Sequence, residues 1–246
     1  MPVAKTSINS RLRGRTALVT GASRGIGFAI ARALAQDGAS LIITARDEDA
    51  LDTAQRELER AGAKVFARAC DVSDSYSVDL LFADIRATFK KLDVLVNNAG
   101  ISPRICNIRD LPYSTWKQVL ATNLDGLFLV TQSALKLMKR GGVIVNNLSV
   151  AATQAFAGSA AYNSSKHGGL GFTNTLREEV REQGIRVIAL LPGPTDTEIW
   201  NTYWPDAPRR KMMSPETVAQ AALNAILLPE NTTVEELKIL PTAGTL

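Results

Sequence analysis

The sequence predicts one doubly wound α/β domain, in which a parallel sheet of about seven strands is flanked by helices. Short apolar runs alternate with amphipathic stretches along the 246 residues, which is the pattern of strands joined by helical crossovers. The runs are apolar at nearly every position, as strands must be when helices cover both faces of their sheet. Neither an internal repeat nor a low-complexity linker divides the chain, so residues 1–246 are expected to form a single domain.

Each predicted element follows from this alternation. The expected strands are Thr16–Thr20, Leu41–Thr44, Val65–Ala67, Val94–Val96, Val143–Val145, Val187–Leu191 and Leu237–Leu240. The expected helices are Ile26–Gln36, Ala50–Arg60, Val78–Phe89, Trp116–Met138, Ala160–Glu182 and Pro215–Leu227. Gly38, Gly62 and Gly184 each separate a helical stretch from a strand, where a left-handed residue commonly ends a helix. Ser214 and Pro215 supply an N-cap and a first-turn proline for the last helix.

Composition indicates a soluble globular protein with a substantial core. Hydrophobic residues make up 46% and charged residues 21%, which excludes a disordered chain, a collagen and a coiled coil. No apolar run approaches the roughly 20 residues that cross a bilayer, and residues 1–10 lack the apolar stretch of a signal peptide. We therefore expect a cytoplasmic protein without a membrane partner. Residues 1–13 are expected to form a flexible N-terminal arm.

The polar residues argue against metal and nucleic-acid chemistry. Cys70 and Cys106 are too few and too far apart for a disulfide framework, so free thiols are expected. The single histidine, His167, excludes a multi-histidine metal site, and no metal is expected. The net charge of +4 comes from scattered basic groups rather than from a basic stripe, so no nucleic-acid partner is expected.

A glycine-rich turn at residues 20–27 follows the first strand and opens the first helix. Its glycines allow a tight turn and let a pyrophosphate approach the free N–H groups of the helix. The same residues also match G-x-S-x-G, the nucleophile elbow of α/β hydrolases, with Ser23 as nucleophile. His167 is the one histidine that could serve as its base, although it lies within a predicted helix. Serine hydrolysis therefore remains a remote alternative.

Tyr162 and Lys166 lie four residues apart, so on a helix they share one face. A nearby ammonium favours the phenolate, so Lys166 is expected to lower the pKa of Tyr162 toward the range useful for proton transfer. Ser149 follows the fifth predicted strand, at the edge of a parallel sheet where ligands bind.

Together these motifs resemble the classical short-chain dehydrogenase/reductase (SDR) family, in its order, from about Gly14 to Pro194. The resemblance is carried by the glycine turn, Asn97-Asn98-Ala99-Gly100, Ser149, Tyr162, Lys166 and Pro192-Gly193. It implies a Rossmann fold and an oxidoreductase that interconverts a carbonyl and an alcohol with a nicotinamide cofactor. It also implies a homo-oligomer, a tetramer or a dimer. A non-catalytic NADP-binding sensor or scaffold is the main alternative, but such proteins commonly lose the tyrosine or the lysine.

The resemblance also implies a role for each residue. Tyr162 would be the general acid or base, Lys166 would bind the nicotinamide ribose, and Ser149 would orient the substrate carbonyl. Asn123 would hold a water in a proton relay, and Asn97 would also brace the sheet. Without the resemblance, Asn123 is interpreted as an asparagine that kinks its helix, which is compatible with that role. The residues implied to bind the cofactor are Gly21, Ser23, Arg24, Gly25, Ile26, Gly27, Arg46, Asp71, Val72, Asn97, Ala99, Gly100, Tyr162, Lys166, Pro192, Gly193, Thr195 and Thr197.

The end of the second strand predicts NADP(H) rather than NAD(H). An NAD enzyme usually places an acid there for the ribose hydroxyls, but this chain has Ala45 followed by Arg46. Arg46 and Arg24 can instead bind a 2′-phosphate. Asp47 is expected to begin the next helix.

The segment 198–213 is expected to cover the substrate. It contains aromatic residues and the basic triple Arg209-Arg210-Lys211, which could form a cationic rim for an acidic substrate. A surface loop that contacts a neighbouring subunit is an equally good interpretation. The C-terminal quarter loosely resembles small 3-hydroxy-acid and general carbonyl reductases more than 3-oxoacyl reductases, and the sequence leaves the substrate unassigned.

Overall fold

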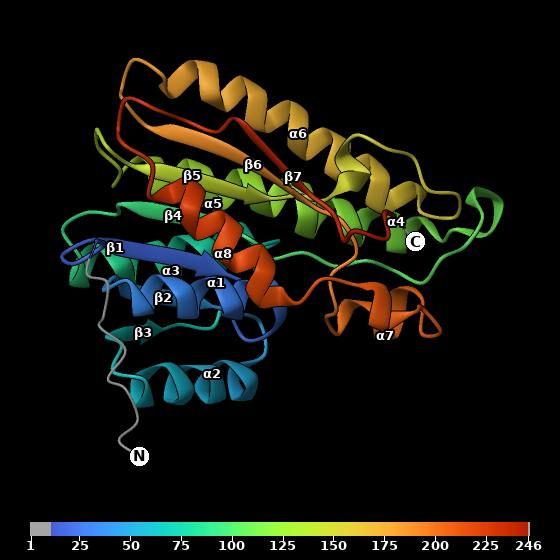
Figure 1. The fold of residues 1–246 in the computed structure, drawn as a ribbon, viewed down its shortest axis with the longest axis horizontal. Coiled ribbons are helices and arrows are strands. Elements are labelled where there is room, and N and C mark those ends of the chain that lie inside the picture. Colours follow the sequence, from blue (N-terminus) through green and yellow to red (C-terminus); the bar gives the residue numbers. More distant parts are fainter. Residues whose placement is uncertain (1–10, 246) are drawn as a thin grey trace.

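The computed structural model describes residues 11–245, and in these residues it contains a sheet of seven parallel strands between two layers of helices (Figure 1). The strands are β1 (Thr16–Thr20), β2 (Ser40–Thr44), β3 (Val65–Ala67), β4 (Val94–Asn97), β5 (Val143–Asn147), β6 (Arg186–Pro192) and β7 (Glu236–Ile239). The helices are α1 (Gly25–Gln36), α2 (Glu48–Arg60), α3 (Ser75–Thr88), α4 (Tyr113–Leu120), α5 (Gly126–Leu135), α6 (Ala160–Val180), α7 (Ile199–Tyr203) and α8 (Pro215–Ile226). Each predicted strand is present, with its ends shifted by no more than two residues.

The strand order is β3-β2-β1-β4-β5-β6-β7, which confirms the doubly wound fold. The chain first builds outward from β1 through β2 to β3. It then returns to the other side of β1 with β4, so Val19 is in register with Ile43 on one side and Val96 on the other. The order therefore reverses next to β1, and the crossovers on the two sides of this point diverge. Such a point opens a crevice at the carboxyl ends of the strands.

The core consists of two layers because alternate strand residues face opposite sides of the sheet. Val19 and Ile43 pack with buried residues of α1, α2 and α8. Leu18 and Ile42, their neighbours along the strands, pack with α3, α5 and α6. Every central strand is thus buried on both faces, which explains its nearly continuous apolar sequence.

The helix ends follow the predicted signals. Gly38, Gly62 and Gly184 all have positive φ angles, between 69° and 94°. The Ser214 hydroxyl accepts a hydrogen bond from the N–H of Thr217 and so caps α8. In the part of the chain that the structure describes, no helix is both long enough and apolar enough to cross a membrane.

The prediction of one continuous helix over residues 116–138 is wrong. The chain forms α4, then a π-helical turn at Ala121–Asp125, and then α5. A π turn inserts one extra residue into the helical register, and such turns are frequent at functional sites. The apolar spacing continues through the interruption, so it does not reveal the turn. The predicted kink at Asn123 takes this form.

The flexible-arm prediction covers residues 1–13, of which residues 1–10 lie outside the described part. Of the remaining three, Arg11 and Leu12 are held by contacts with the end of α1. The Arg11 guanidinium forms an ion pair with the buried carboxylate of Asp37 at 2.7 Å, and the N–H of Leu12 donates to the carbonyl oxygen of Asp37. Leu12 itself is 6% exposed. Burial of Leu12 and this pairing hold the residues against the end of α1.

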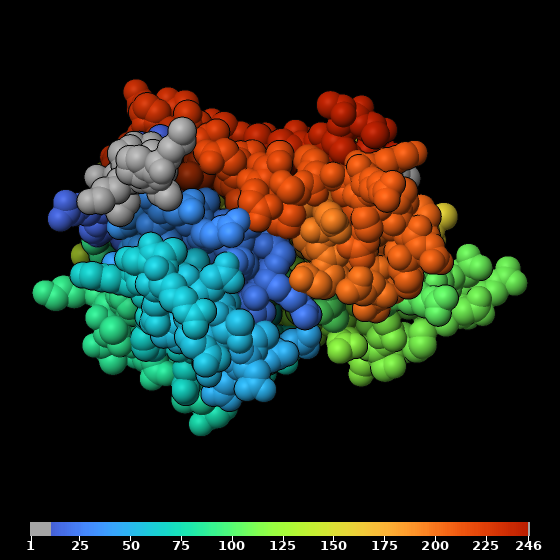
Figure 2. Space-filling view, turned by 60° about the horizontal axis from the view of Figure 1, so that its bottom comes forward, coloured from blue at the N-terminus to red at the C-terminus, as the bar shows by residue number. Residues whose placement is uncertain are grey.

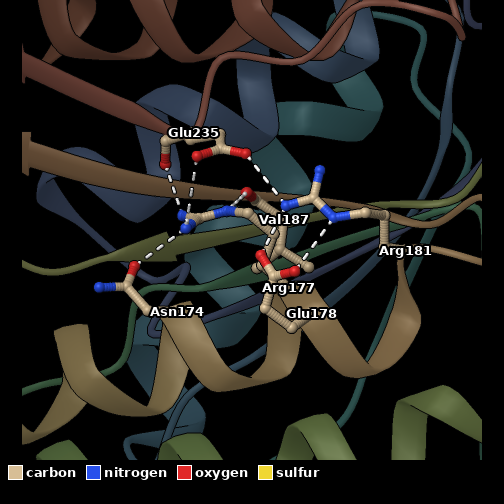
Figure 3. Close-up of polar contacts among 6 residues, drawn as sticks. All are labelled: Asn174, Arg177, Glu178, Arg181, Val187 and Glu235. Carbon is tan, nitrogen blue, oxygen red and sulfur yellow. Dashed lines mark hydrogen bonds and ion pairs between the residues drawn. The ribbon is translucent and has the colours of Figure 1, made fainter.

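A buried arginine ties α6 to the last two strands (Figure 3). Arg177 donates from Nε to the carbonyl oxygen of Val187 on β6 at 3.1 Å and from Nη2 to that of Glu235 at 2.8 Å. A third hydrogen bond joins Nη1 to Asn174 Oδ1 at 2.9 Å. Arg181, one turn further along α6, contacts only the carboxylates of Glu178 and Glu235 and is half exposed.

We expect Arg177→Leu to lower the free energy of unfolding by about 2–4 kcal/mol, because two buried carbonyl oxygens lose their donors. The matched control is Arg181→Leu, which removes two exposed ion pairs and should have a much smaller effect. Urea denaturation followed by circular dichroism measures both values. Equal losses in the two variants would show that the carbonyl contacts of Arg177 are unimportant.

Candidate active site

A cavity of about 910 Å³ opens at the carboxyl ends of the central strands. It lies beside β1, where the strand order reverses. Its walls include the glycine turn after β1, the ends of β2, β4, β5 and β6, and the helix α7. Figure 2 shows the surface where the blue N-terminal part of the chain meets the orange segment that carries α7. The position is the one predicted for a ligand site in an open parallel sheet.

The glycine turn packs too closely against the end of β4 to accept side chains. Gly21 has a φ of +61°, and a Cβ atom there would lie 2.8 Å from the Cα of Ala99. A Cβ atom on Gly27 would collide with the amide of Asn98 and with the carbonyl oxygen of Gly21. The absence of these side chains leaves a cradle of backbone at the start of α1, as an approaching phosphate requires.

Asn98 fixes the shape of this turn. Its Nδ2 donates to the carbonyl oxygens of Thr20 and Gly21, at 3.0 and 2.9 Å. In return, the Thr20 hydroxyl accepts the N–H groups of Asn98 and Ala99, both at 3.0 Å. The end of β1 is thereby joined to the end of β4, and the backbone of the turn is held in place before any ligand binds.

Asn97 was expected to line the cofactor site, but the structure places its neighbour Asn98 at the cavity instead. Asn98 lines the cavity and Asn97 does not. The Asn97 amide instead donates to Thr131 and Asn146, both at 2.9 Å, and braces the sheet. Side chains alternate along a strand, so adjacent residues cannot both face the same side. That alternation is the signal that could have identified Asn98.

The residue directly after β2 is not acidic, and two arginines and one aspartate line the cavity near it. Ala45 directly follows the strand and is buried, whereas Arg46 and Arg24 are exposed at the cavity. Asp47 also reaches the cavity, but its carboxylate accepts the N–H of Ala50 at 3.0 Å and caps α2. The predicted position of the strand end is confirmed. An anion at this place would meet two guanidinium groups.

Ser149, Tyr162 and Lys166 meet at the floor of the cavity. Ser149 follows β5, and its hydroxyl oxygen accepts the N–H of Ala151 at 3.1 Å, which leaves the hydroxyl proton free to be donated. Tyr162 and Lys166 come from adjacent turns of α6. The Lys166 ammonium lies over the Tyr162 ring, 5.5 Å from its centre.

Burial controls the ionisation of both groups on α6. Burial raises the pKa of Tyr162 to about 12, although a hydrogen bond with Ser149 opposes the rise. Burial also lowers the pKa of Lys166 to about 8. The expected lowering of the Tyr162 pKa by Lys166 is therefore not found in this structure, because burial disfavours the charged form of each side chain. Tyr162 holds its proton at neutral pH.

A chain of hydrogen bonds joins Lys166 to the glycine turn. Lys166 Nζ donates to the carbonyl oxygen of Asn147 at 3.2 Å, and Asn147 Nδ2 donates to Asn98 Oδ1 at 2.8 Å. Asn98 in turn holds Gly21, as described above. Asn147 is a residue that the sequence analysis missed, because no motif marks it. It places the ammonium and the phosphate cradle in one connected network.

Asn123 lies behind the cavity and uses its whole side chain for support. Its Oδ1 accepts the N–H of Ile101 at 2.8 Å, and its Nδ2 donates to the Ile101 carbonyl oxygen at 2.9 Å and to Ser165 Oγ at 3.0 Å. The side chain therefore connects the loop after β4 to α6. Its position in a π turn sets it apart from the regular helix on either side.

A second, very small cavity of about 10 Å³ separates Asn123 from Lys166. Asn97 and Asn147 also line it. Among the described residues, the Oδ1 atoms of Asn97 and Asn147 are buried without a hydrogen-bond donor. The volume is close to the lower limit of about 10–15 Å³ for holding one water molecule.

Most of the predicted cofactor residues line the main cavity. These are Gly21, Ser23, Arg24, Gly25, Ile26, Arg46, Val72, Ala99, Gly100, Tyr162, Lys166, Pro192, Gly193, Thr195 and Thr197. Gly27, Asp71, Asn97 and Asn123 do not line it. The Asp71 carboxylate instead accepts the N–H and the hydroxyl of Ser73, at 2.9 and 2.7 Å, and shapes the turn before α3.

The segment 198–213, which was expected to cover the substrate, lines the cavity with its aromatic residues. Its basic residues do not line the cavity. Trp200 and Tyr203 of α7 line the cavity, together with Trp204. Arg209 is directed away: its guanidinium binds Asp196, the Thr197 carbonyl oxygen and Asn201, each at 2.7 Å. Neither Arg210 nor Lys211 lines the cavity. The expectation of a cationic rim is therefore wrong, because the first arginine caps local carbonyl and carboxylate oxygens.

The hydrolase alternative lacks its base. Ser23 lines the cavity, but His167 does not. His167 is exposed on α6, with Nδ1 3.0 Å from the Asn163 carbonyl oxygen of its own helix. No other histidine exists in the sequence, so Ser23 has no imidazole partner.

The fold and the site define a class of α/β protein with a dinucleotide-type crevice and a Ser-Tyr-Lys cluster at its floor. The chain belongs to the short chain dehydrogenase family, whose model matches residues 15–208. The match spans the glycine turn, the three cluster residues and α7. It includes every residue that lines the cavity except Thr245.

Individual relatives agree with this assignment. The chain is 38% identical over 193 residues to a 3beta-hydroxysteroid dehydrogenase of Mediterraneibacter gnavus, covering 78% of this chain and 70% of the relative. An alcohol dehydrogenase of Thermococcus sibiricus, solved in complex with 5-hydroxy-NADP, superimposes with a TM-score of 0.86 at 31% identity, over 93% of this chain and 97% of that one. A short chain dehydrogenase of Burkholderia cenocepacia in complex with NADP gives 0.86 at 32% identity, over 95% and 99%.

Proposed function

We propose that the protein is an NADP(H)-dependent oxidoreductase that interconverts a carbonyl compound and an alcohol, with Tyr162 as its proton donor. The observation that carries this proposal is the meeting of Ser149, Tyr162 and Lys166 at one end of a cavity whose other parts include a phosphate cradle. The solved relatives that contain NADP support the same cofactor.

The residues present suit NADP(H). The backbone N–H groups of the glycine turn would receive the pyrophosphate, and Gly21 and Gly27 allow the turn to pack closely against the end of β4 in this shape. Arg24 and Arg46 would hold the 2′-phosphate with planar, charge-assisted hydrogen bonds. Asp47 lines the same cavity and keeps its negative charge, but Oδ1 caps α2 and the two guanidinium groups outnumber it. The position directly after β2, where an NAD(H) enzyme usually has an acid, is occupied by Ala45.

The protein's part in the reaction is binding, orientation and proton transfer. Bound NADPH supplies a hydride to the carbonyl carbon. Ser149 donates a hydrogen bond to the carbonyl oxygen, and Tyr162, which is protonated at neutral pH, transfers its proton to the same oxygen. Gain of the hydride and of this proton yields the alcohol. In the reverse direction Tyr162 accepts the proton.

Tyr162 must regain its proton after each turnover. Lys166 is the nearest ionisable group on α6, and the small cavity behind it is lined by Asn123 and Asn147. A water molecule in this cavity could join the Lys166 ammonium to the unpartnered oxygens of Asn97 and Asn147. Asn123 would support this relay as a positioning residue, through its bonds to Ile101 and Ser165.

The function is tested by mixing the protein with NADPH and a panel of ketones and aldehydes and following the NADPH absorbance. We expect turnover of about 1 s⁻¹ or faster with at least one compound class, as is usual for enzymes. Cofactor binding is measured separately by calorimetry. Tight NADPH binding without turnover of any carbonyl or alcohol would identify a sensor or scaffold and would overturn the catalytic proposal.

A further inference from the structure

We propose that the substrate is a neutral carbonyl compound with an apolar, preferably aromatic, body, and that α7 selects it. This inference rests on the proposed function, because it concerns the same site. It differs from the acidic substrate that the basic triple at residues 209–211 had suggested. Three observations carry it: an apolar wall, the bonds that hold this wall in place, and the distribution of charge around the cavity.

The substrate end of the cavity is bounded by what we call the apolar wall. It consists of Ile105, Phe156, Ile199, Trp200, Tyr203 and Trp204. Ile105 and Trp204 remain 40% and 37% exposed, although both are large apolar side chains. Exposed apolar surface at the edge of a cavity is typical of a site that an apolar ligand covers.

Hydrogen bonds hold the wall over the catalytic tyrosine. The Trp200 indole N–H donates to the Thr195 carbonyl oxygen at 2.8 Å, and the hydroxyl oxygens of Tyr203 and Ser159 lie 2.7 Å apart. The N–H of Ile105 donates to the Tyr203 carbonyl oxygen at 3.3 Å. These bonds connect α7 with three other segments of the cavity, so the wall is a fixed surface. A fixed surface selects shape at little entropic cost.

Tyr203 gives this surface its geometry next to the reacting atoms. Its ring centre lies 6.2 Å from that of Tyr162, with 41° between the ring planes. The Trp200 ring also packs against the Tyr203 ring, edge to face, with 5.4 Å between the ring centres. A flat substrate whose carbonyl reaches Tyr162 would lie against these rings, and aromatic contacts of this kind add to the effect of burial.

The charges around the cavity disfavour an anionic substrate. Among the described residues that line it, the cations are Arg24, Arg46 and Lys166. Arg24 and Arg46 lie at the phosphate end, and Lys166 is bound to Asn147. Glu198, directly before α7, also lines the cavity, but its Oε2 lies close to Gly25 of the glycine turn and so brings no cation to the apolar wall. An acid bound against the apolar wall would lose its hydration without gaining a partner.

The test compares 4-acetylbenzamide with 4-acetylbenzoate, which have nearly the same shape and differ in charge. We expect kcat/KM to be at least about tenfold higher for the amide, since an uncompensated charge costs more than 1.4 kcal/mol. Binding of the two compounds to the NADP⁺ complex is measured independently through the fluorescence of Trp200 and Trp204. Equal kcat/KM and equal affinity for the two compounds would overturn the inference.

A cation introduced into the wall should change the preference. Trp204→Arg is expected to raise relative kcat/KM for the benzoate by about tenfold or more over the neutral control Trp204→Gln. Tyr113→Ala serves as a surface control, because Tyr113 is 72% exposed on α4 and outside the cavity. Failure of Trp204→Arg to favour the benzoate would contradict the wall's place at the substrate. If no ketone is reduced, the fluorescence comparison still tests the inference while the proposed function fails.

Discussion

Tyr162→Phe is expected to lower kcat for carbonyl reduction by about 10²-fold or more, because proton transfer by a positioned side chain contributes this much. Only a hydroxyl group is lost, and it lies at the floor of the cavity rather than in a packed core. The fold and the affinity for NADPH should therefore be retained. Steady-state kinetics with saturating NADPH measures the loss of turnover, and calorimetry measures cofactor binding.

The matched control for this variant is Tyr203→Phe, in the same cavity. It removes the hydroxyl that contacts Ser159 and keeps the ring, so its effect on kcat should be much smaller. Turnover of Tyr162→Phe close to that of the wild-type protein would remove Tyr162 from the reaction. The sensor or scaffold interpretation would then be the better account of the site.

The second large effect concerns the choice of cofactor. Arg46→Ala should weaken NADPH binding by about ten- to a hundredfold, since one charge-assisted hydrogen bond to a phosphate contributes roughly 1.5–3 kcal/mol. NADH lacks the 2′-phosphate and should be little affected. The double variant Ala45→Asp with Arg46→Ile adds repulsion and removes attraction, so the preference should reverse. The measurement is kcat/KM with each cofactor.

Arg109→Ala is the control for these cofactor variants, because Arg109 is exposed and lies outside the cavity. A wild-type protein that prefers NADH would show that the strand end does not select the cofactor. A preference for NADPH that survives in Arg46→Ala would assign the 2′-phosphate mainly to Arg24.

The sheet could be predicted from the sequence because burial on both faces makes each central strand apolar at nearly every position. Val19 and Leu18 face opposite helical layers, and both must be apolar. The floor of the site could also be predicted, because Ser149 follows a recognisable strand and Tyr162 lies one turn from Lys166 on a recognisable helix. The π turn at Ala121–Asp125 was not predicted as such: the sequence indicated a helical stretch with a kink at Asn123, because the apolar pattern before and after the turn is helical.

Other features depend on contacts between distant parts of the chain. Asn147 acts through Asn98, which lies 49 residues earlier in the chain, and no local motif records that bond. The orientation of Arg209 depends on its bonds to the carbonyl oxygen of Thr197 and to Asn201. The basic composition of residues 209–211 does not reveal these bonds and therefore suggested a wrong role. The pKa of Tyr162 likewise depends on burial, which spacing along a helix does not reveal.

The short last strand leaves part of β6 at an open margin of the sheet. β7 pairs only with residues 189–192 of β6, so the first residues of β6 have no strand beyond them. Unpaired backbone at a sheet edge invites pairing with another polypeptide. Arg177 occupies the Val187 carbonyl oxygen at this place, and Arg186 extends to the carbonyl oxygens of Ile226 and Thr232. Because Arg177 occupies a carbonyl oxygen that an added strand would need, we expect its loss to promote aggregation through this edge.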